Sequence, residues 1–563
     1  MKSPKRWKLQ TQHEVVAKKV ASELSVSPLI AQLLLNRNIT NLSKARFYLA
    51  EVPEPVQFDL NLLDSIYTLI SQTIANNETI FLYGDYDVDG MSSTAMMVKC
   101  LTSMGAVVRY KLPHRFNDGY GLNDSVVELI NTEKCGLFIT LDCGITNVSE
   151  IQNIKSKTNS KVIVIDHHQI PSTRPAADII LNPKDVRMPT ELVELCTAGI
   201  VYKLVNYLSE RVGSINCDDY LFLAAIGTVA DVVELQGENR RIVKLGLQLL
   251  NTVKNLGVQA LLDNAKWKGS FLTVRDVGFV IAPRLNAAGR LSSAQYGVEL
   301  LLASTKARAE EIANYLEKLN LQRRELDQAV FNESIEVVDS SDHYENQSVL
   351  VFGEENWHAG VIGIAASKLA EKYSKPVVIV GFDEVIGRGS ARSVGDVDIY
   401  SLLNQCRSCF EKFGGHKQAA GFSIKQDKFS EFKTMLESVV NTSVDKTQLV
   451  ENIMIDLELK TKFITRSFID ELSVLEPFGH GNHQPLFYSK DFNVVDSRVV
   501  GNGKHLKLTL NDKVERKSFD AIGFNLAEKL PLVYNENVHF VFSLEINVWN
   551  DKETIQLNIK DMK

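Results

Sequence analysis

The chain has 563 residues and a net charge of −7, from 62 Lys and Arg against 69 Asp and Glu. Domains usually hold about 100 to 200 residues, so this length predicts several domains, and the apolar and charged fractions are ordinary for folded protein. The negative total excludes a protein coated with positive charge for nucleic acid, so any site for a polyanion must be local.

The sequence predicts no membrane span, no signal peptide and no disulfide framework. The longest nearly apolar run, 220–230, is shorter than the ~18 residues of a membrane helix, and no apolar stretch follows the basic N-terminus as a signal peptide requires. Seven scattered cysteines are typical of a reducing compartment. We therefore expect a cytoplasmic protein without a membrane partner.

Three short β-branched runs in the first third of the chain each stop at an acidic residue. They are 79–84, 136–141 and 161–165, followed by Asp85, Asp142 and Asp166. Continuous runs of this kind predict strands buried on both faces, with crossover helices between them, as in a parallel α/β sheet. Because ligands bind outside the carboxyl ends of such strands, we expect the three acids to share one crevice.

The pattern in the rest of the sequence predicts a long connecting helix, a second α/β unit and a β domain. Apolar residues at 3-4 spacing over 303–337 predict a long amphipathic helix. The second unit is predicted from strands at 348–352, 376–381 and 419–424 and helices at 360–373 and 399–413. After about residue 490 apolar and polar residues alternate, which favours an antiparallel sheet with one buried face. A small OB-type β-barrel fits this length, and a β-sandwich is the alternative.

The segment Gly84–Gly90 places Asp85, Asp87 and Asp89 within five residues at a strand-to-helix turn. Like charges this close are costly unless a cation neutralises them, and hard divalent ions prefer oxygen ligands. The alternative is a helix N-terminus at which the macrodipole favours acids.

Two further segments extend this predicted cation site. Asp166, His167 and His168 follow a strand directly, and histidine with carboxylates suits manganese, magnesium or zinc, although such a pair is often only a polar turn. Asp231 follows the apolar run and needs a metal, a helix N-terminus or a salt bridge to offset its burial.

Glycine-rich segments in the second unit predict phosphate contacts. Gly387–Ser393 combines flexible backbone with Ser390 and Arg392, and arginine binds phosphate bidentately. The segment 414–416 lets backbone approach phosphate before the next strand. An ordinary surface loop is the alternative reading of the first segment. The pair Cys406 and Cys409 has no second pair at zinc spacing and is expected to be structural, within the helix predicted there.

Several motifs together resemble the DHH phosphoesterase superfamily and, within it, the bacterial exonucleases specific for single strands. The motifs are Asp85–Gly90, Pro113–Gly121, Asp166–His168, Gly227–Val232, Pro283–Arg290, Trp357–Gly363, Gly414–His416 and Glu476–Asn482. The resemblance implies an N-terminal helical segment (1–50), a catalytic DHH domain (51–300), a connecting helix (301–340), a substrate-binding DHHA1 domain (341–445) and an OB-like nucleic-acid-binding domain (446–563).

The resemblance also implies roles for individual residues. The implied ligands of two Mn²⁺ or Mg²⁺ ions are Asp85, Asp87, Asp142, His167 and Asp231. Asp166 is implied to support these ligands and His168 to contact the scissile phosphate. Substrate contacts are implied for Arg115, Arg284, Ser390, Arg392, Gly414, Gly415 and His416, with Ser390 and Arg392 at a terminal 5′ phosphate.

The implied activity is 5′ to 3′ exonuclease action on single-stranded DNA that releases 5′ mononucleotides, in recombination and repair. The sequence contains no GxxxxGK[ST] motif, so we expect a separate helicase to expose the strand, with a single-strand-binding protein as a further partner and the enzyme as a monomer. The alternatives are a DHH phosphodiesterase for short oligonucleotides or cyclic dinucleotides and a non-catalytic scaffold.

Overall fold

The computed structural model describes residues 5–115, 121–123, 125–133, 135–213, 215–253, 255–340, 344, 347–514, 517–535, 537–549 and 552–563. The chain forms two compact units, which are described separately. The larger unit comprises Lys8–Ala282, Gly297–Ala309 and Met454–Lys563, and the smaller comprises Pro283–Tyr296, Glu310–Ile453 and the chain start up to Trp7.

A five-stranded parallel sheet forms the centre of one part of the larger unit, as the three β-branched runs predicted. Its order is β3-β2-β4-β5-β6. The strands are β2 (Thr79–Gly84), β3 (Val107–Lys111), β4 (Cys135–Leu141), β5 (Lys161–Ile165) and β6 (Ile179–Leu181). The three predicted strands are therefore the adjacent central strands β2, β4 and β5, and β3 and β6 are the edges.

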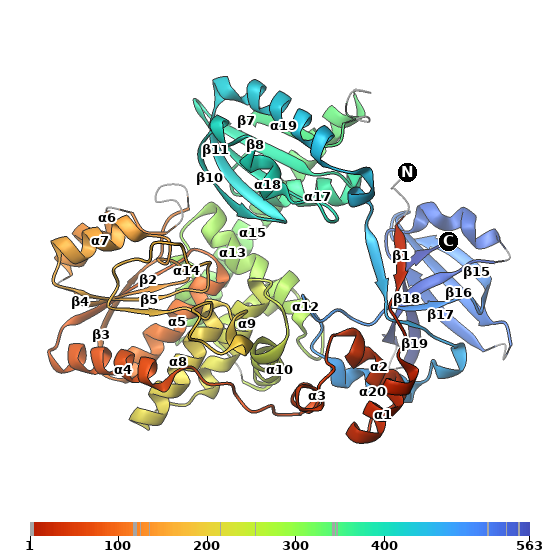
Figure 1. Cartoon of the computed structure of the whole chain (residues 1–563), viewed down its shortest axis with the longest axis horizontal. Coiled ribbons are helices and arrows are strands. Elements are labelled where there is room, and N and C mark those ends of the chain that lie inside the picture. Colours follow the sequence, from red (N-terminus) through yellow and green to blue (C-terminus); the bar gives the residue numbers. More distant parts are fainter. Residues whose placement is uncertain are drawn as a thin grey trace. The chain divides into compact units, whose positions relative to one another are not determined.

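Helices cover both faces of this sheet (Figure 1). Helices α6 (Ser125–Thr132) and α7 (Val148–Lys157) pack on the face that carries Phe81 and Phe138. Helices α4 (Leu60–Ala75) and α5 (Val88–Ser103) pack on the opposite face. This double cover explains why the strands read as uninterrupted apolar runs rather than as an alternating pattern.

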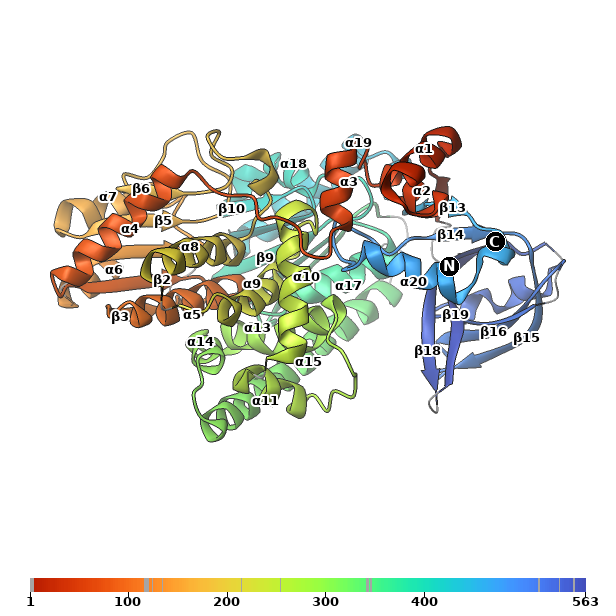
Figure 2. The same cartoon turned by 90° about the horizontal axis from the view of Figure 1, so that it is seen from below.

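The helices that complete the part of the larger unit around the parallel sheet follow in the sequence. They are α8 (Thr197–Val212), α9 (Asp218–Ala230), α10 (Gly237–Thr252), α11 (Leu256–Asn264), α12 (Val274–Asp276) and α14 (Gln295–Leu301). Helices α5, α8 and α9 pack against one another (Figure 2). Among the described residues, the structure contains no helix whose length and apolar character would let it cross a membrane.

The C-terminal part is a seven-stranded sheet of order β13-β14-β18-β19-β17-β16-β15. Its strands are β13 (Leu457–Glu458), β14 (Phe487–Ser489), β15 (Phe492–Val500), β16 (His505–Asp512), β17 (Ser518–Gly523), β18 (Phe540–Trp549) and β19 (Lys552–Met562). The predicted one-face burial is confirmed along β16, which alternates regularly. The sheet is not wholly antiparallel, because β13 pairs with β14 and β17 pairs with β19 in parallel.

The N-terminal helices α1 (Glu14–Leu24), α2 (Pro28–Asn36) and α3 (Leu42–Leu49) precede the parallel sheet in the sequence. Apolar residues of α2 and α3, including Leu33 and Tyr48, belong to the same core as Phe487 and Phe542 of the C-terminal sheet. Helix α20 (Arg466–Leu472) contributes Phe468 to this core. The N-terminal segment is therefore packed on the OB-like domain, far from it in sequence.

The smaller unit contains a mixed sheet of order β10-β11-β9-β8-β7. Its strands are β7 (Leu350–Glu355), β8 (Val377–Asp383), β9 (Ile386–Arg392), β10 (Phe410–His416) and β11 (Ala419–Lys425). Its helices are α13 (Ala282–Leu291, which begins one residue before this unit), α15 (Lys306–Asp339, whose first residues belong to the larger unit), α17 (Ile362–Tyr373), α18 (Ile399–Asn404) and α19 (Phe429–Ser443). The short strands β1 (Arg6–Leu9) and β12 (Asn452–Ile455) pair with each other. The predicted long helix is confirmed as α15.

The smaller unit differs from the sequence prediction at two places. Residues 386–392 form strand β9, which the sequence did not predict and which excludes the alternative reading as an ordinary surface loop. Gly389 leaves room for the ring of Phe422, since a Cβ at Gly389 would lie 2.2 Å from it. The predicted helix 399–413 ends at Asn404, and a 3₁₀ turn, Arg407–Cys409, leads into strand β10. Cys406 and Cys409 are free thiols buried in the core of this unit, as a structural role requires.

Candidate active site

The carboxyl ends of β2, β4 and β5 bring the acids together, as the sheet pattern predicted. Asp85, Asp142 and Asp166 directly follow these three adjacent strands, and all three are buried. Asp142 has a positive φ of 66°, a conformation that aspartate and asparagine tolerate better than most residues. This turn directs the chain away from the sheet where the acids converge.

The Asp-x-Asp-x-Asp-Gly segment folds as the start of helix α5. Asp87 is its N-cap, and its Oδ1 accepts hydrogen bonds from the backbone N–H groups of Asp89 (2.9 Å) and Gly90 (3.1 Å). Gly90 is required by close packing, since a Cβ there would lie 2.5 Å from the backbone oxygen of Asp85. The helix therefore starts tightly against the strand end, which concentrates all three carboxylates.

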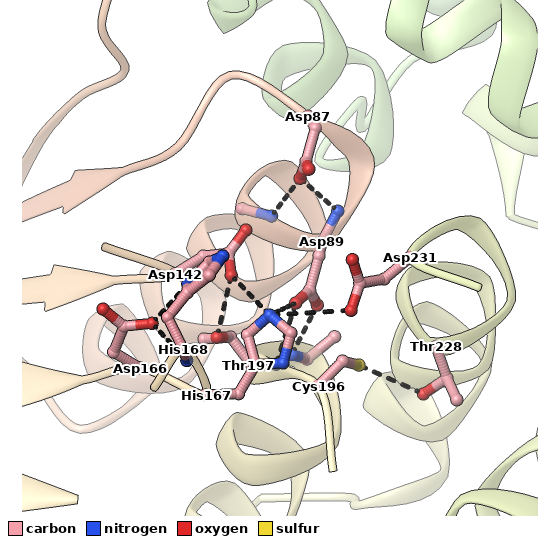
Figure 3. Close-up of polar contacts among 12 residues, drawn as sticks. Asp87, Asp89, Asp142, Asp166, His167, His168, Cys196, Thr197, Thr228 and Asp231 are labelled. Carbon is pink, nitrogen blue, oxygen red and sulfur yellow. Dashed lines mark hydrogen bonds and ion pairs between the residues drawn. The ribbon is translucent and has the colours of Figure 1, made fainter. Parts of the chain in front are cut away.

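His167 lies among carboxylates from several segments of the chain (Figure 3). Its Nε2 lies 3.4 Å from Asp142 Oδ1, 3.5 Å from Asp231 Oδ2 and 4.0 Å from Asp89 Oδ2. Asp231 reaches this point because it is the C-cap of α9. The structure thus brings together side chains from the end of β4, the start of α5 and the end of α9, which are far apart in the sequence.

Within the part of the chain that the structure describes, three groups of side chains could each hold a metal ion, with ligand atoms within 4.8 Å of one another. The groups are Asp85, Asp87 and Asp142; Asp89, His167 and Asp231; and Asp142, His167 and His168. The first two groups share no residue, and the short Asp142–His167 contact links them. This arrangement suits two neighbouring divalent ions.

Two buried oxygens in these groups show that the residues fit a cation. Asp85 Oδ1 and Asp231 Oδ2 accept no hydrogen bond from the residues that the structure describes. A buried carboxylate oxygen without a donor is costly, and a coordinated cation would offset that cost. All five ligands predicted from the sequence belong to the three groups.

Burial and mutual repulsion shape the charge of this cluster. Burial first, and then the charge of Asp87, raises the pKa of Asp85 well above its ordinary value. Burial and the charges of Asp89 and Asp87 do the same to the pKa values of Asp142 and Asp231. The pKa of Asp89 is raised to about 6 by burial and by Asp87. Carboxylates that resist ionisation in this way are stabilised as anions by cations.

His168 is held differently from His167. Its Nδ1 lies 2.7 Å from Asp166 Oδ1, which also accepts the backbone N–H of His168 (3.0 Å). Burial opposes protonation of His168, but the hydrogen bond and charge of Asp166 outweigh it and raise the pKa of the imidazole. Asp166 therefore fixes the ring through Nδ1 and leaves Nε2 as the nitrogen that can reach a substrate.

Asp89 was missing from the ligand set predicted from the sequence, yet it lies within the cluster. Its two oxygens accept the first backbone N–H groups of α8, from Thr197 (2.8 Å) and Ala198 (2.6 Å). Thr197 Oγ1 in turn donates to Asp142 Oδ1 at 3.0 Å. The third carboxylate of the motif was visible in the sequence, but the role of α8 was not, because it depends on packing between distant segments.

Arg115 lies near the cluster. Its guanidinium carbon lies 5.0 Å from the centroid of the Tyr86 ring, and its charge acts to lower the pKa of Asp85. The motif that contains it, Pro113–Gly121, lies partly outside the described residues, because residues 116–120 are not described.

The substrate-binding residues predicted for the smaller unit lie close together on neighbouring strands of its sheet, except Arg284. Strand register places Ser390 opposite Gly421 and Gly421 opposite Gly414, and it places Arg392 and His416 on either side of Ala419. Gly415 alternates to the other face of the sheet. Arg392 donates to Ser390 Oγ (3.0 Å) and Ser367 Oγ (3.1 Å).

Arg284 is separate from this group. It is buried, and its Nε donates to Glu317 of α15 at 2.5 Å. This ion pair joins α13 to α15 within the smaller unit, so Arg284 has a structural role in addition to the substrate contact implied by the resemblance.

Family models match three segments of the chain. The DHH family N-terminal domain matches residues 79–228, the DHHA1 domain matches residues 346–442, and the RecJ OB domain matches residues 455–561. These segments cover the parallel sheet, the mixed sheet and the C-terminal sheet respectively.

Curated relatives match almost the whole chain. The single-stranded-DNA-specific exonuclease RecJ of Bacillus subtilis is 33% identical over 567 residues, which cover 99% of this chain and 71% of that protein. The protein of the same name from Haemophilus influenzae is 32% identical, with 96% of each chain covered.

Solved structures show the same fold. Thermus thermophilus RecJ in complex with Mn²⁺ matches with a TM-score of 0.84 and 28% identity, over 99% of this chain and 79% of that one. An exonuclease RecJ bound to manganese matches with a TM-score of 0.60 and 32% identity, over 70% of this chain and 97% of that one.

Proposed function

Because the chain belongs to the RecJ family of single-stranded-DNA-specific exonucleases, we propose that it is a metal-dependent exonuclease that degrades single-stranded DNA from 5′ to 3′. The products would be 5′ mononucleotides, and the process served would be DNA recombination and repair. The observation that carries this proposal is the gathering of carboxylates around His167 at the ends of three adjacent strands.

The residues that would hold Mn²⁺ or Mg²⁺ are those of the two linked groups. They are Asp85, Asp87, Asp89, Asp142, His167 and Asp231. When bound, such ions lower the pKa of water and neutralise charge that develops on phosphate during hydrolysis.

The side chains around the metal groups would orient the substrate. His168 would donate a hydrogen bond from Nε2 to the scissile phosphate, while Asp166 accepts the hydrogen bond of Nδ1 and raises the pKa of the imidazole, which favours the protonated ring. Arg115 would neutralise a phosphate near the cluster. Ser390, Arg392, Gly414, Gly415 and His416 would bind the 5′ end of the strand, with Arg284 as a further contact.

The wider setting belongs to the same proposal. The enzyme would act in the cytoplasm as a monomer, on strands exposed by a helicase and accompanied by a single-strand-binding protein. We infer the five domain limits stated from the sequence, with 51–300 catalytic, 341–445 substrate-binding and 446–563 nucleic-acid-binding. The alternative, a DHH phosphodiesterase for short oligonucleotides or cyclic dinucleotides, would use the same metal groups and differ in substrate length.

End-labelled substrates test the proposal. Full-length protein with Mn²⁺ would be given long and dinucleotide single strands that carry a label at either end, with the variant Asp142→Asn as the control. We expect mononucleotides released stepwise from the 5′ end of long strands. Release from the 3′ end, activity on dinucleotides alone, or equal activity in the Asp142→Asn control would each refute it.

A further inference from the structure

The exposed side of strands β9, β11 and β10 forms an ordered surface of cationic and small residues. Side chains alternate along a strand, so directly paired residues of neighbouring strands share a face. The register gives three rows across the strands: Arg392, Ala419 and His416; Ser390, Gly421 and Gly414; and Arg388, Ser423 and Lys412. We call these nine residues the phosphate face.

Burial confirms that this side of the sheet is outward. Arg388, Lys412, Gly414, His416 and Gly421 are exposed. The alternate positions, including Ala391, Phe422 and Ile424, belong to the core that is covered by α19. At β9, β10 and β11 one side of the sheet is therefore an aromatic core and the other a cationic surface. That surface ends at β8, where Val377 and Ile379 on the same side belong to the core that contains α17.

The middle row of the phosphate face has almost no side chains. A Cβ at Gly414 would have no neighbour within 4 Å, and one at Gly421 would have only the backbone oxygen of Gly389, at 3.8 Å. The centre is therefore a flat strip of backbone between two cationic rows. Such a strip can accept a bulky chain lying across it, whereas larger side chains would obstruct that chain.

The positive surface has a defined end. Beyond the third row, Lys425 lies 3.5 Å from Glu411, so its charge is balanced by an acid. The nine residues of the phosphate face themselves comprise two arginines, a lysine and a histidine, together with serine, alanine and glycine. Their charge is carried by the two outer rows, on either side of the glycine strip.

From this arrangement we propose that Arg388 and Lys412 form a second phosphate subsite for the same single strand. The inference rests on the proposed function, in which Ser390 and Arg392 bind the 5′ phosphate. Two residues along a strand span about 6.7 Å, so the outer rows, four residues apart, are separated by about 13 Å and can serve two phosphates of one chain that lie two nucleotides apart. The glycine strip would pass beneath the intervening nucleotide. Apart from His416 the face has no aromatic ring, so we expect contacts to the backbone rather than to bases.

Binding measurements without cleavage test this inference. Full-length protein in a chelating buffer would be titrated with a fluorescent 12-nucleotide single strand that carries a 5′ phosphate, at several salt concentrations. For the double variant Arg388→Ala with Lys412→Ala we expect a dissociation constant about tenfold higher or more. The slope of log K against log salt should fall by about 0.7, the value for one lost phosphate contact on a single strand.

A matched control removes the same kind of charge from the opposite side of the unit. Lys428 immediately precedes α19, which covers the core side of the sheet, so Lys428→Ala should leave both affinity and salt slope unchanged. An unchanged slope in the double variant would overturn the inference, and so would a loss of equal size in Lys428→Ala. Equal competition by a polyglutamate peptide of the same charge would also overturn it, because a general anion surface would suffice.

Short probes locate the second phosphate. The wild type should bind a 5′-phosphorylated trinucleotide, whose first and third phosphates lie two nucleotides apart, more tightly than a 5′-phosphorylated dinucleotide, and the double variant should lose this difference. A retained difference would refute the subsite. The Mn²⁺ cleavage assay on the wild type judges the proposed function separately: 5′ to 3′ degradation with no binding defect in the variant would reject only the second subsite.

Discussion

The metal groups and the phosphate face handle charge in opposite ways. The carboxylates around His167 are buried or partly buried and repel one another, and two of their oxygens accept no hydrogen bond from the described residues. The cations of the phosphate face stand on an exposed sheet surface, where water screens them. A buried cluster of like charge destabilises the folded protein until an ion binds, whereas an exposed one costs folding little and acts only on the ligand.

The largest effect should come from removing a ligand in the metal groups. Asp142→Asn keeps the shape, the positive φ and the acceptor for Thr197, but removes the charge. We expect the rate of strand degradation with Mn²⁺ to fall more than the ~100-fold typical of changes to residues that only support the ligands. Single-turnover kinetics measure this, and a loss under about tenfold would mean that Asp142 is not a ligand.

The second-largest effect on the rate should come from Asp166, which supports the site without being a predicted ligand. Asp166→Asn weakens the hydrogen bond that holds His168 Nδ1, while the ligand groups stay intact. We expect kcat to fall about 10- to 100-fold with little change in affinity for the strand. Steady-state kinetics separate the two constants, and a change confined to KM would contradict the proposed role of His168.

On the phosphate face, Arg392→Ala should weaken binding of strands with a 5′ phosphate. Charge-assisted hydrogen bonds are worth about 1.5 to 3 kcal/mol, or roughly 10- to 100-fold in affinity. Strands with a 5′ hydroxyl should be affected less. Anisotropy titrations compare the two ends, and an equal loss for both would show that Arg392 does not recognise the terminal phosphate.

The free energy of unfolding should show that Asp142 is destabilising without metal and stabilising with it. Without metal, Asp142→Asn should increase the free energy of unfolding by about 1 to 3 kcal/mol, because it removes a buried charge that is repelled by its neighbours. With saturating Mn²⁺ the sign should reverse, since only the wild type gains full binding energy. Thermal unfolding with chelator and with Mn²⁺ tests both signs, and a variant less stable in both conditions would contradict this account.

Asp185 supplies the contrasting case of a buried acid with partners. Hydrogen bonds from Arg187 and Arg174 outweigh burial and hold the pKa of its carboxyl below the ordinary value. Asp185→Asn should therefore lower stability at neutral pH, by roughly 1 kcal/mol because both arginines are partly exposed.

The loss of stability in Asp185→Asn should depend on pH, because the pKa of Asp185 is lowered in the folded protein. The stabilisation is present above the unfolded-state pKa of about 3.9 and is lost as pH falls through the folded value. The gap between wild type and Asp185→Asn should therefore narrow below about pH 4. Unfolding curves from about pH 3 to pH 7 measure it, and a constant gap would rule out the carboxylate charge as its source.

Some features of the site were predictable because they follow from local pattern and strand geometry. Apolar runs that end in Asp85, Asp142 and Asp166 predict parallel strands, and parallel strands place their carboxyl ends at one edge. Other features were not predictable locally. Strand β9 at 386–392 was not predicted because two glycines interrupt it, but Phe422 packs over Gly389 and keeps this segment in the sheet.

The sequence by itself determined the parallel sheet, the long helix, the alternating C-terminal strands and most members of the groups that could hold metal, because each depends on residues close in sequence. Only the tertiary structure placed Asp89 beneath the N-terminus of α8, joined the metal groups through His167 and Asp142, and aligned Arg388 with Lys412 across β11. Those contacts join segments far apart in the chain, and their geometry depends on packing and strand register.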